Sequence, residues 1–347
     1  MNLSVKSLAC EVFSFVASAY IQKNIRNVLT IVMYHSVVEK LPDLYDWCYV
    51  DAESFLRQIR YLKKNFEVIP LSQVSSRLKS GSIDSPLAVI TFDDGYQNNF
   101  DVAFPLLKKE GLPATIFLTT GLINTDDTLW VCRLHNAFND TRANELNWEG
   151  KIFDISGRDN KVKLIALIKK KFKKMPIVKL LPELKEVLNE LGYDISSPIE
   201  RDSLYRMLDY ESINVMRQSG LIDFGAHTMT HEILSRLSRE EQEREITGSV
   251  HSVSEITGGE CRMFAYPNGA RGDYNRDTME ILDMCGIEVS VTTIEEMFNA
   301  DTPLLELRRY GIGAGMKMGY FKLLVSHFIA WSKGLRLFSY RENGNFN

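Results

Sequence analysis

The sequence predicts an α/β fold, a distorted (β/α) barrel with a helical insertion and terminal helices. Three observations support this prediction. Apolar runs of strand length recur with helical stretches between them, which is typical of a parallel sheet covered by helices. The chain has 347 residues, a length that a single barrel-type domain can reach. The alternation is interrupted once, between about residue 125 and residue 200.

Eight apolar runs are the candidate strands, and they place the barrel within residues 29–312. Because they are apolar nearly throughout, we expect both faces of the sheet to be buried. The runs are LTIVMYH at 29–35, FEVIP at 66–70, PLAVITF at 86–92, PATIFLTT at 113–120, LIDFGAH at 221–227, CRMFAYP at 261–267, IEVSVTT at 287–293 and LLELRRY at 304–310.

The interruption at about 125–200 has apolar residues at helical spacing and clustered lysines, which predicts a helical insertion over one end of the barrel. Its basic face either meets solvent, the more common case, or meets an anionic lipid or sugar phosphate. Residues 1–28 are predicted to form an amphipathic helix, because Glu11 interrupts an apolar stretch shorter than the roughly 20 residues of a spanning helix. No clear signal-peptide cleavage site follows.

Residues 313–347 are predicted to form a C-terminal helix and tail. This helix either lies on a membrane surface or packs back onto the barrel. The formal charge of -4, from 41 basic and 45 acidic residues, argues against a nucleic-acid partner. Five widely spaced cysteines without a C-x-x-C pair indicate reduced thiols. We therefore expect a cytoplasmic protein, with peripheral contact at the inner membrane face as an open alternative.

Polar residues that end the strands of a parallel α/β fold face its active site. Asp93 and Asp94 end one strand, before Gly95, and alone they would suggest only a solvated turn. His227 ends another strand, and His231 follows at a spacing that would put both rings on one face of a helical turn. Asp94 and the two histidines are therefore the predicted ligands of a divalent metal, with zinc expected, that keeps sites open for water and substrate.

Such a metal would explain why two acids adjoin, because a dication stabilises both as anions. Asp93, which is adjacent but not a ligand, is the predicted base that accepts a proton from water. A third strand end, FAYPNG at 264–269, forms a turn whose N–H groups can hold an oxyanion, although an isolated motif of this kind is only a turn. Its Tyr266, Pro267 and Asn268, together with Tyr96 beside the acid pair, are the candidate substrate or oxyanion contacts.

In this order, TFDDG, HTMTH and FAYPNG resemble the polysaccharide deacetylase family, the NodB-homology hydrolases of carbohydrate esterase family 4. The resemblance covers roughly residues 29–124 and 205–312. It implies a distorted barrel that removes an N-acyl group, usually N-acetyl, from an amino sugar with zinc or another divalent ion. It also implies that the first acid of the pair is the catalytic base and that the second binds the metal with the two histidines.

Two departures from the family pattern concern the residues around the base. The third motif usually has an arginine where this chain has Ala265, and we expect Arg309, at the end of a later strand, to replace it. The late histidine that usually serves as general acid has no clear counterpart. His35, at the end of the first strand, is the candidate for that role, and a structural histidine hydrogen-bonded in the barrel end is an equally supported alternative.

The predicted function is a metal-dependent amidohydrolase that removes an acetyl or formyl group from an amino sugar in surface polysaccharide biosynthesis. The substrate would be an amino-sugar glycan or a lipid- or nucleotide-linked sugar. A non-catalytic sugar-binding protein on the same fold is the first alternative, favoured by the altered third motif. A metal-dependent esterase or phosphodiesterase is the second, although two-metal sites usually need more ligands.

Overall fold

The computed structural model describes residues 29–79, 85–200, 203–298 and 301–327. The predicted N-terminal helix at 1–28 and the C-terminal tail after residue 327 lie outside these ranges. Within the described residues, no helix is both long and apolar enough to cross a membrane. The four described cysteines are all free, in line with the expected reduced thiols.

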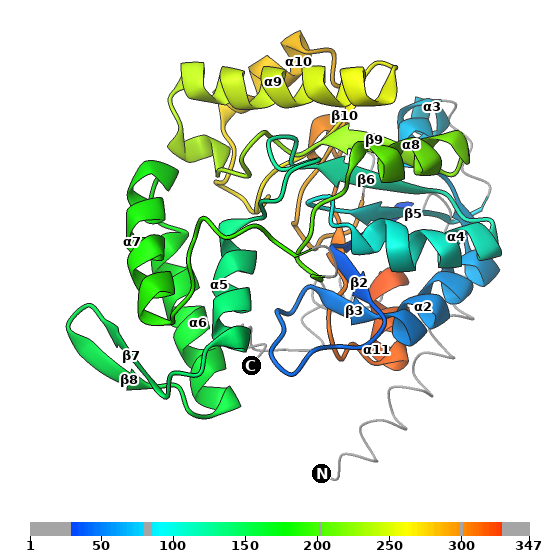
Figure 1. Cartoon of the computed structure of the whole chain (residues 1–347). Coiled ribbons are helices and arrows are strands. Elements are labelled where there is room, and N and C mark those ends of the chain that lie inside the picture. Colours follow the sequence, from blue (N-terminus) through cyan, green and yellow to red (C-terminus); the bar gives the residue numbers. More distant parts are fainter. Residues whose placement is uncertain (1–28, 80–84, 201–202, 299–300, 328–347) are drawn as a thin grey trace, which may run out of the picture.

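A curled parallel sheet forms the centre of the molecule, as predicted (Figure 1). Its strands follow the spatial order β11-β10-β9-β6-β5-β1-β12, with β4 paired to β5 beside this path. The bounds are β1 (Leu29–Tyr34), β4 (Glu67–Val68), β5 (Leu87–Phe92), β6 (Ala114–Leu118), β9 (Ile222–Ala226), β10 (Met263–Ala265), β11 (Val289–Val291) and β12 (Tyr310–Gly311). Nearly every strand residue is buried, which explains why the runs are apolar throughout.

The two edges of the sheet approach each other, because Leu307, just before β12, forms a parallel bridge with Val291 of β11. This closure makes the architecture a distorted barrel. The strand predicted at 304–310 is mostly wrong, since Leu304–Glu306 form a 3-10 helix after Pro303 and only Tyr310 enters a strand. Tyr310 and Gly311 pair with Val32 and Met33 of β1.

Helices cover the outside of the sheet (Figure 1), and several of them begin at side-chain caps. Asp51 caps α2 through the N–H of Ser54, and Ser238 forms a capping box with Glu241 at the start of α9. The helices of the barrel are α2 (Ala52–Asn65), α3 (Val74–Lys79), α4 (Phe104–Glu110), α8 (Tyr210–Gln218), α9 (Arg239–Thr257), α10 (Arg276–Met284) and α11 (Met318–Val325). Helix α11 packs onto α2, with Phe321 edge-on to Tyr61, so its described part packs back onto the barrel.

The stretch at 125–200 has a hydrophobic core of its own. It consists of α5 (Trp130–Asp140), β7 (Glu145–Trp148), β8 (Lys151–Asp154), α6 (Arg158–Phe172) and α7 (Ile177–Glu190), which stand beside the open end of the barrel (Figure 1). Strands β7 and β8 form an antiparallel hairpin that the sequence analysis missed. The signal in the sequence was the alternation of polar and apolar residues in ELNW before Gly150. In the structure, Glu149 and Gly150 form the turn with positive φ.

The loop between β2 (Ser36–Val38) and β3 (Tyr49–Asp51) connects the barrel to this second core. Leu44 of the loop is buried within it. Asp46 of the same loop forms an ion pair with Lys169 of α6. This loop therefore supplies both an apolar and an ionic contact between the barrel and the insertion.

Candidate active site

The two acids of the DDG motif lie directly after β5, where the strand reaches the open end of the barrel. The N–H of Asp93 still continues the sheet pairing by donating to the carbonyl of Tyr34. Asp94 then takes a φ of 75° and Gly95 a φ of 85°, so the chain turns sharply through two left-handed residues. A non-glycine residue in this region is strained, and such strain is common at functional sites. Both carboxylates are buried.

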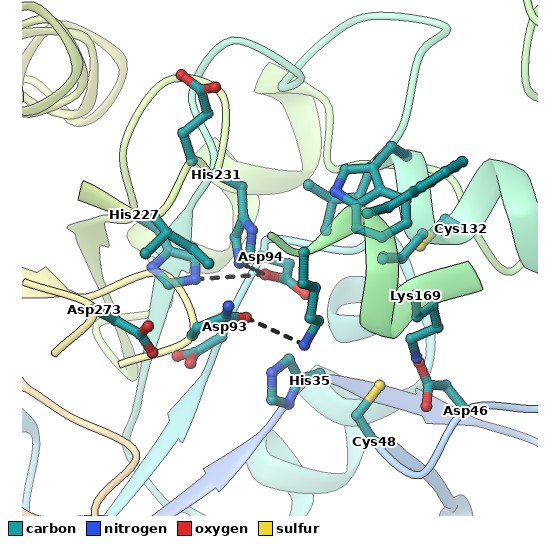
Figure 2. Close-up of a pocket in the computed structure, with 18 of the residues that line it drawn as sticks. His35, Asp46, Cys48, Asp93, Asp94, Cys132, Lys169, His227, His231 and Asp273 are labelled. Carbon is teal, nitrogen blue, oxygen red and sulfur yellow. Dashed lines mark hydrogen bonds and ion pairs between the residues drawn. The ribbon is translucent and has the colours of Figure 1, made fainter. Parts of the chain in front are cut away.

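His227 directly follows β9 and is fixed by a hydrogen bond at the far side of its ring. Its Nδ1–H donates to the carbonyl oxygen of Ala265 at 2.7 Å. This bond places a proton on Nδ1 and turns Nε2 toward Asp94 (Figure 2). A histidine oriented through a backbone carbonyl in this way is typical of a metal ligand.

His231 reaches the same point from a loop and not from the helical turn that its spacing suggested. Residues 227–231 form no helix, because Thr228 and His231 have φ values of 63° and 61°. The hydroxyl of Thr228 accepts the N–H of His231 and closes the turn. The spacing argument therefore placed the right two imidazoles together for the wrong geometric reason.

Glu245 of α9 holds this loop from outside the site. Its carboxylate accepts hydrogen bonds from the N–H groups of Met229 and Thr230, and from the hydroxyl of Thr230. The three bonds occupy backbone donors that the left-handed turn leaves without partners in secondary structure. Nothing in the sequence analysis identified Glu245, since it lies on a helix in a run of other charged residues.

Asp94, His227 and His231 each offer one ligand atom, and these atoms all lie within 4.8 Å of one another. The Nε2 atoms of His227 and His231 are 3.5 and 3.4 Å from the same Oδ1 of Asp94. That oxygen is buried and has no hydrogen-bond partner in the described chain. Ligands about 2.0–2.1 Å from a tetrahedral zinc lie roughly 3.3–3.4 Å apart, so the three side chains fit a divalent ion.

The charges of Asp94 and His231 agree with a metal site, whereas His227 would have to give up a proton from Nε2 to bind the ion. Burial raises the pKa of Asp94, but the adjacent His227 and His231 outweigh it and keep that pKa well below its usual range. Burial lowers the pKa of His231 to about 4, so its ring is neutral at neutral pH. For His227, burial lowers the pKa, whereas Asp94 and Asp93 raise it more strongly and leave it above the ordinary value. An anionic oxygen and neutral imidazoles are the forms that bind metal ions.

Arg309 makes a bidentate ion pair with Asp93, and this is the contact that the sequence analysis expected of it. Its Nη1 and Nη2 lie 2.6 and 2.7 Å from the two oxygens of Asp93. Its Nε donates to the carbonyl of Thr292, and the whole side chain is buried. Burial raises the pKa of Asp93, but the Arg309 charge outweighs it and lowers that pKa. Asp93 is therefore held as an anion, beside the triad but outside it.

His35 lines the pocket from the end of β1 (Figure 2). Its Nδ1 is buried and has no hydrogen-bond partner among the described residues. Trp47 packs edge-on against the ring at 5.6 Å between centroids. The hydrogen-bonded structural histidine, the alternative left open above, therefore lacks the expected partner at this nitrogen.

The four candidate substrate contacts divide into two groups. Asn268 lines the pocket with a φ of 58°, and its N–H has no acceptor in the described chain. Tyr96 also lines the pocket, but it is buried and its hydroxyl contacts Cys132 at 3.1 Å. Tyr266 points elsewhere, since its hydroxyl donates to the carbonyl of Leu305, and neither it nor Pro267 lines the pocket. Both residues shape the turn that presents Asn268.

The pocket that contains these residues has a volume of about 720 Å³, within the usual range for a ligand site. The barrel supplies its floor, and the insertion supplies one wall. That wall includes Lys169, Lys173 and the apolar side chains of Trp130 and Phe172.

Comparison with known proteins identifies the family. A family model described as polysaccharide deacetylase matches residues 81–290, more than half of the chain. The chain belongs to the polysaccharide deacetylase family. A curated relative, YxkH of Bacillus subtilis (strain 168), is named for the same family and is 22% identical over 306 residues, covering 88% of this chain and 78% of the relative.

Solved deacetylases share the fold. PplD of Streptococcus pyogenes, solved in complex with acetate, matches with a TM-score of 0.58 and 20% identity, over 87% of this chain and 99% of that chain. IcaB of Ammonifex degensii matches with a TM-score of 0.54 and 18% identity, over 86% of this chain and 97% of that chain. The predicted family and barrel type are thus confirmed.

Family membership gives this deacetylase its reaction class. It is a hydrolase of carbon–nitrogen bonds other than peptide bonds, and deacetylation of a polysaccharide is the activity that the family supports. A glycan substrate follows from the same membership. The family generally depends on a divalent metal, and the Asp94, His227 and His231 triad could hold one.

Sequence analysis missed one cluster on the pocket wall. Asp46 is ion-paired with Lys169 (Figure 2). The Nε2 of His135 lies 3.5 Å from the same carboxylate. The sequence analysis gave His135 no role, yet it lies buried in α5 and lines the pocket. The only available signal was a histidine between apolar residues of a helix, which also describes an ordinary core histidine.

Proposed function

We propose that this deacetylase is a divalent-metal-dependent amidohydrolase that removes an N-acetyl or N-formyl group from an amino sugar of a glycan or glycan precursor. Asp94, His227 and His231 would hold the ion, and zinc suits this set of one carboxylate and two imidazoles. When bound, the ion would polarise the acyl carbonyl and acidify a water. The observation that carries the proposal is an anionic carboxylate, Asp93, held beside the triad without being part of it.

Asp93 is the proposed base. Its two oxygens face Arg309, and this ion pair fixes the carboxylate and keeps it ionised at neutral pH. An ionised carboxylate in reach of the acyl carbon can accept the proton of the attacking water. Arg309 is a positioning residue in this scheme, since it contacts Asp93 and not the substrate.

Asn268 and His35 would complete the reaction. The free N–H of Asn268 is a donor for the oxyanion that forms when water adds to the carbonyl. His35 would donate a proton to the amine as the carbon–nitrogen bond breaks, because its ring lines the pocket with an unpartnered nitrogen. The products are a carboxylic acid and a free amino sugar.

The sugar would lie in the pocket against aromatic side chains. Trp47 is 44% exposed and lines the pocket next to His35. An exposed indole offers an apolar face to the C–H surface of a sugar ring. A free glycan, a lipid-linked sugar and a nucleotide-linked sugar all present such a ring, and the enzyme would act on one of them in surface polysaccharide biosynthesis.

Release of acetate tests this function directly. Metal-stripped enzyme would be supplied with zinc and with N-acetylated or N-formylated amino-sugar oligosaccharides, and the acid and free amine would be quantified. We expect zinc-dependent release by the wild type and almost none by Asp93→Asn. Binding without release by the wild type would support a sugar-binding protein, and faster cleavage of acetyl esters or phosphodiesters than of amides would support the second alternative.

A further inference from the structure

The end of helix α6 brings two lysines of the insertion into the active-site pocket. Lys169 lies in the last turn of the helix, and Lys173 is its C-cap residue. They are four residues apart and therefore on the same face of the helix. Both line the pocket that holds the metal triad. Their surroundings differ, and that difference suggests a role for Lys173.

The positive charge of Lys169 is balanced by a neighbouring carboxylate. Lys169 forms an ion pair with Asp46, whose side chain is only 19% exposed, and His135 stands on the other side of the same carboxylate. Burial raises the pKa of Asp46, but His135 and Lys169 outweigh it and keep that pKa far below its usual range. The charge of Lys169 therefore serves the contact between the insertion and the barrel loop.

Lys173 forms no ion pair with any described residue of the chain. Its single hydrogen bond runs from Nζ to the side-chain oxygen of Asn268 at 3.3 Å, a long bond to a neutral acceptor. An ammonium has three donors, so two remain for a ligand. Burial and the nearby Lys169 lower the pKa of Lys173, although Asp46 and Asp273 partly oppose them. The chain thus keeps a cation in the pocket without a bonded counter-ion.

Two other carboxylates that line the pocket, Asp273 and Glu232, have partners of their own. Asp273 accepts the N–H of Ala270, and burial raises the pKa of its carboxyl. Glu232 accepts the N–H of Ile177 at the start of α7. These bonds hold both carboxylates within local turns of the backbone. An anion on the ligand would be the stronger partner for the ammonium.

We propose that Lys173 binds an anionic group of the substrate, a phosphate or a carboxylate carried by the amino sugar or its neighbour. This inference rests on the proposed function. Asn268 supports it, because the residue that would receive the acyl oxyanion at its N–H also contacts Lys173 through its side chain. The anionic group would consequently lie next to the N-acyl group. The insertion would select charged amino sugars over neutral ones.

Binding by an inactive enzyme tests the inference separately from catalysis. In an Asp93→Asn background, calorimetry would compare three probes, namely the neutral methyl glycoside of N-acetylglucosamine, N-acetylglucosamine 1-phosphate and N-acetylmuramic acid. We expect tighter binding of at least one anionic probe, and a loss of roughly tenfold in that preference in Lys173→Gln. Lys173→Arg should restore part of it. Preference for the phosphate or the carboxylate probe identifies which group is bound.

Lys174→Gln is the matched control, since it removes the same charge from an adjacent exposed lysine that does not line the pocket. Equal affinities of wild type for neutral and anionic probes would overturn the inference. The same holds if Lys173→Gln keeps the preference, weakens all probes equally, or behaves like Lys174→Gln. Acetate release by the active enzyme reports the proposed function independently, so its failure would be recognised as a separate result.

Discussion

The barrel end and the insertion wall meet in one pocket, yet they are built differently. On the barrel side, Asp93, Asp94 and His227 are buried at the ends of strands. Asp93 is fixed by the ion pair with Arg309, and His227 is fixed by a bond to a backbone carbonyl. On the insertion side, Lys173 comes from the end of a helix and is held by one long hydrogen bond. Under the two proposals above, the barrel side would carry the chemistry and the insertion side would select the substrate.

Removal of the proposed base should cause the largest loss of turnover, and it changes only the barrel side of the pocket. Asp93→Asn keeps the shape of the side chain but cannot accept the proton, so turnover should fall by roughly 10²- to 10⁴-fold. Metal content, measured by elemental analysis, should persist because the triad is intact. Substantial residual turnover would show that another group is the base, and loss of metal would show that Asp93 is itself a ligand.

Arg309→Met keeps the proposed base, Asp93, but removes the positive charge that stabilises its carboxylate. It leaves Asp93 buried without its partner, and we expect a loss of about 3–5 kcal/mol of stability at neutral pH. Because Arg309 lowers the pKa of Asp93 against the effect of burial, its removal should shift the acidic limb of the activity profile upward by about 1–3 pH units.

The sign of the stability effect follows from the same shift. A carboxylate with a lowered folded pKa stabilises the protein above its unfolded pKa, and this contribution is lost as the pH falls through the folded value. The deficit of Arg309→Met should therefore shrink in acid. Arg309→Lys, which keeps the charge but not the two-pronged contact, should be affected less. A pH profile that stays unchanged in Arg309→Met would contradict the role given to the ion pair.

The next largest effect is expected from Glu245, which holds the loop that carries His231. Glu245→Gln removes the charge from the carboxylate that accepts three hydrogen bonds from Met229 and Thr230, two residues that precede His231. We expect metal affinity to fall by roughly 10- to 100-fold, as for other groups that orient ligands from behind. Glu243→Gln, an exposed change on the same helix, is the control. Equal metal affinity in both variants would leave Glu245 without this role.

The same contrast explains how far the sequence could predict the molecule. Most strands were found because a parallel strand is buried on both faces, so each appears as an apolar run such as Leu87–Phe92. The acid pair and both histidines were found because they directly follow such runs or lie a few residues beyond. Arg309 was found for the same reason, at the end of an apolar run, although only its last residue joins a strand.

Other features had no such local signal. The turn that brings His231 to Asp94 depends on left-handed residues and on Glu245 from a distant helix, so spacing alone suggested a helical turn. Tyr266 follows a strand within a family motif, yet its side chain turns away because the carbonyl of Leu305 accepts its hydroxyl. The lysines of α6 were expected mainly to meet solvent, since periodicity does not show what a helix face packs against.

The link between insertion and barrel should contribute a moderate effect on stability alone. Lys169→Met removes the partner of Asp46, and the lost charged contact should cost about 1.5–3 kcal/mol. Asp46 has a lowered pKa, so the contribution is present at neutral pH and is lost on acidification. In Lys169→Met, amide hydrogen exchange should accelerate more in α6 than in β5, relative to the wild type. Lys170→Met, an exposed change, should show neither effect.

A substitution in the hairpin turn should have the smallest effect, and it tests whether the insertion can be destabilised without changing catalysis in the barrel. Gly150 has a φ of 71° and open space around it, so alanine there meets backbone strain alone. Gly150→Ala should cost about 1 kcal/mol, confined to the insertion, and should leave acetate release unchanged. Gly259→Ala, which has equal space without a positive φ, is the control. If the small loss at Gly150 also slowed deacetylation, the insertion would take part in the chemistry, and the division between a catalytic barrel and a selective wall would be wrong.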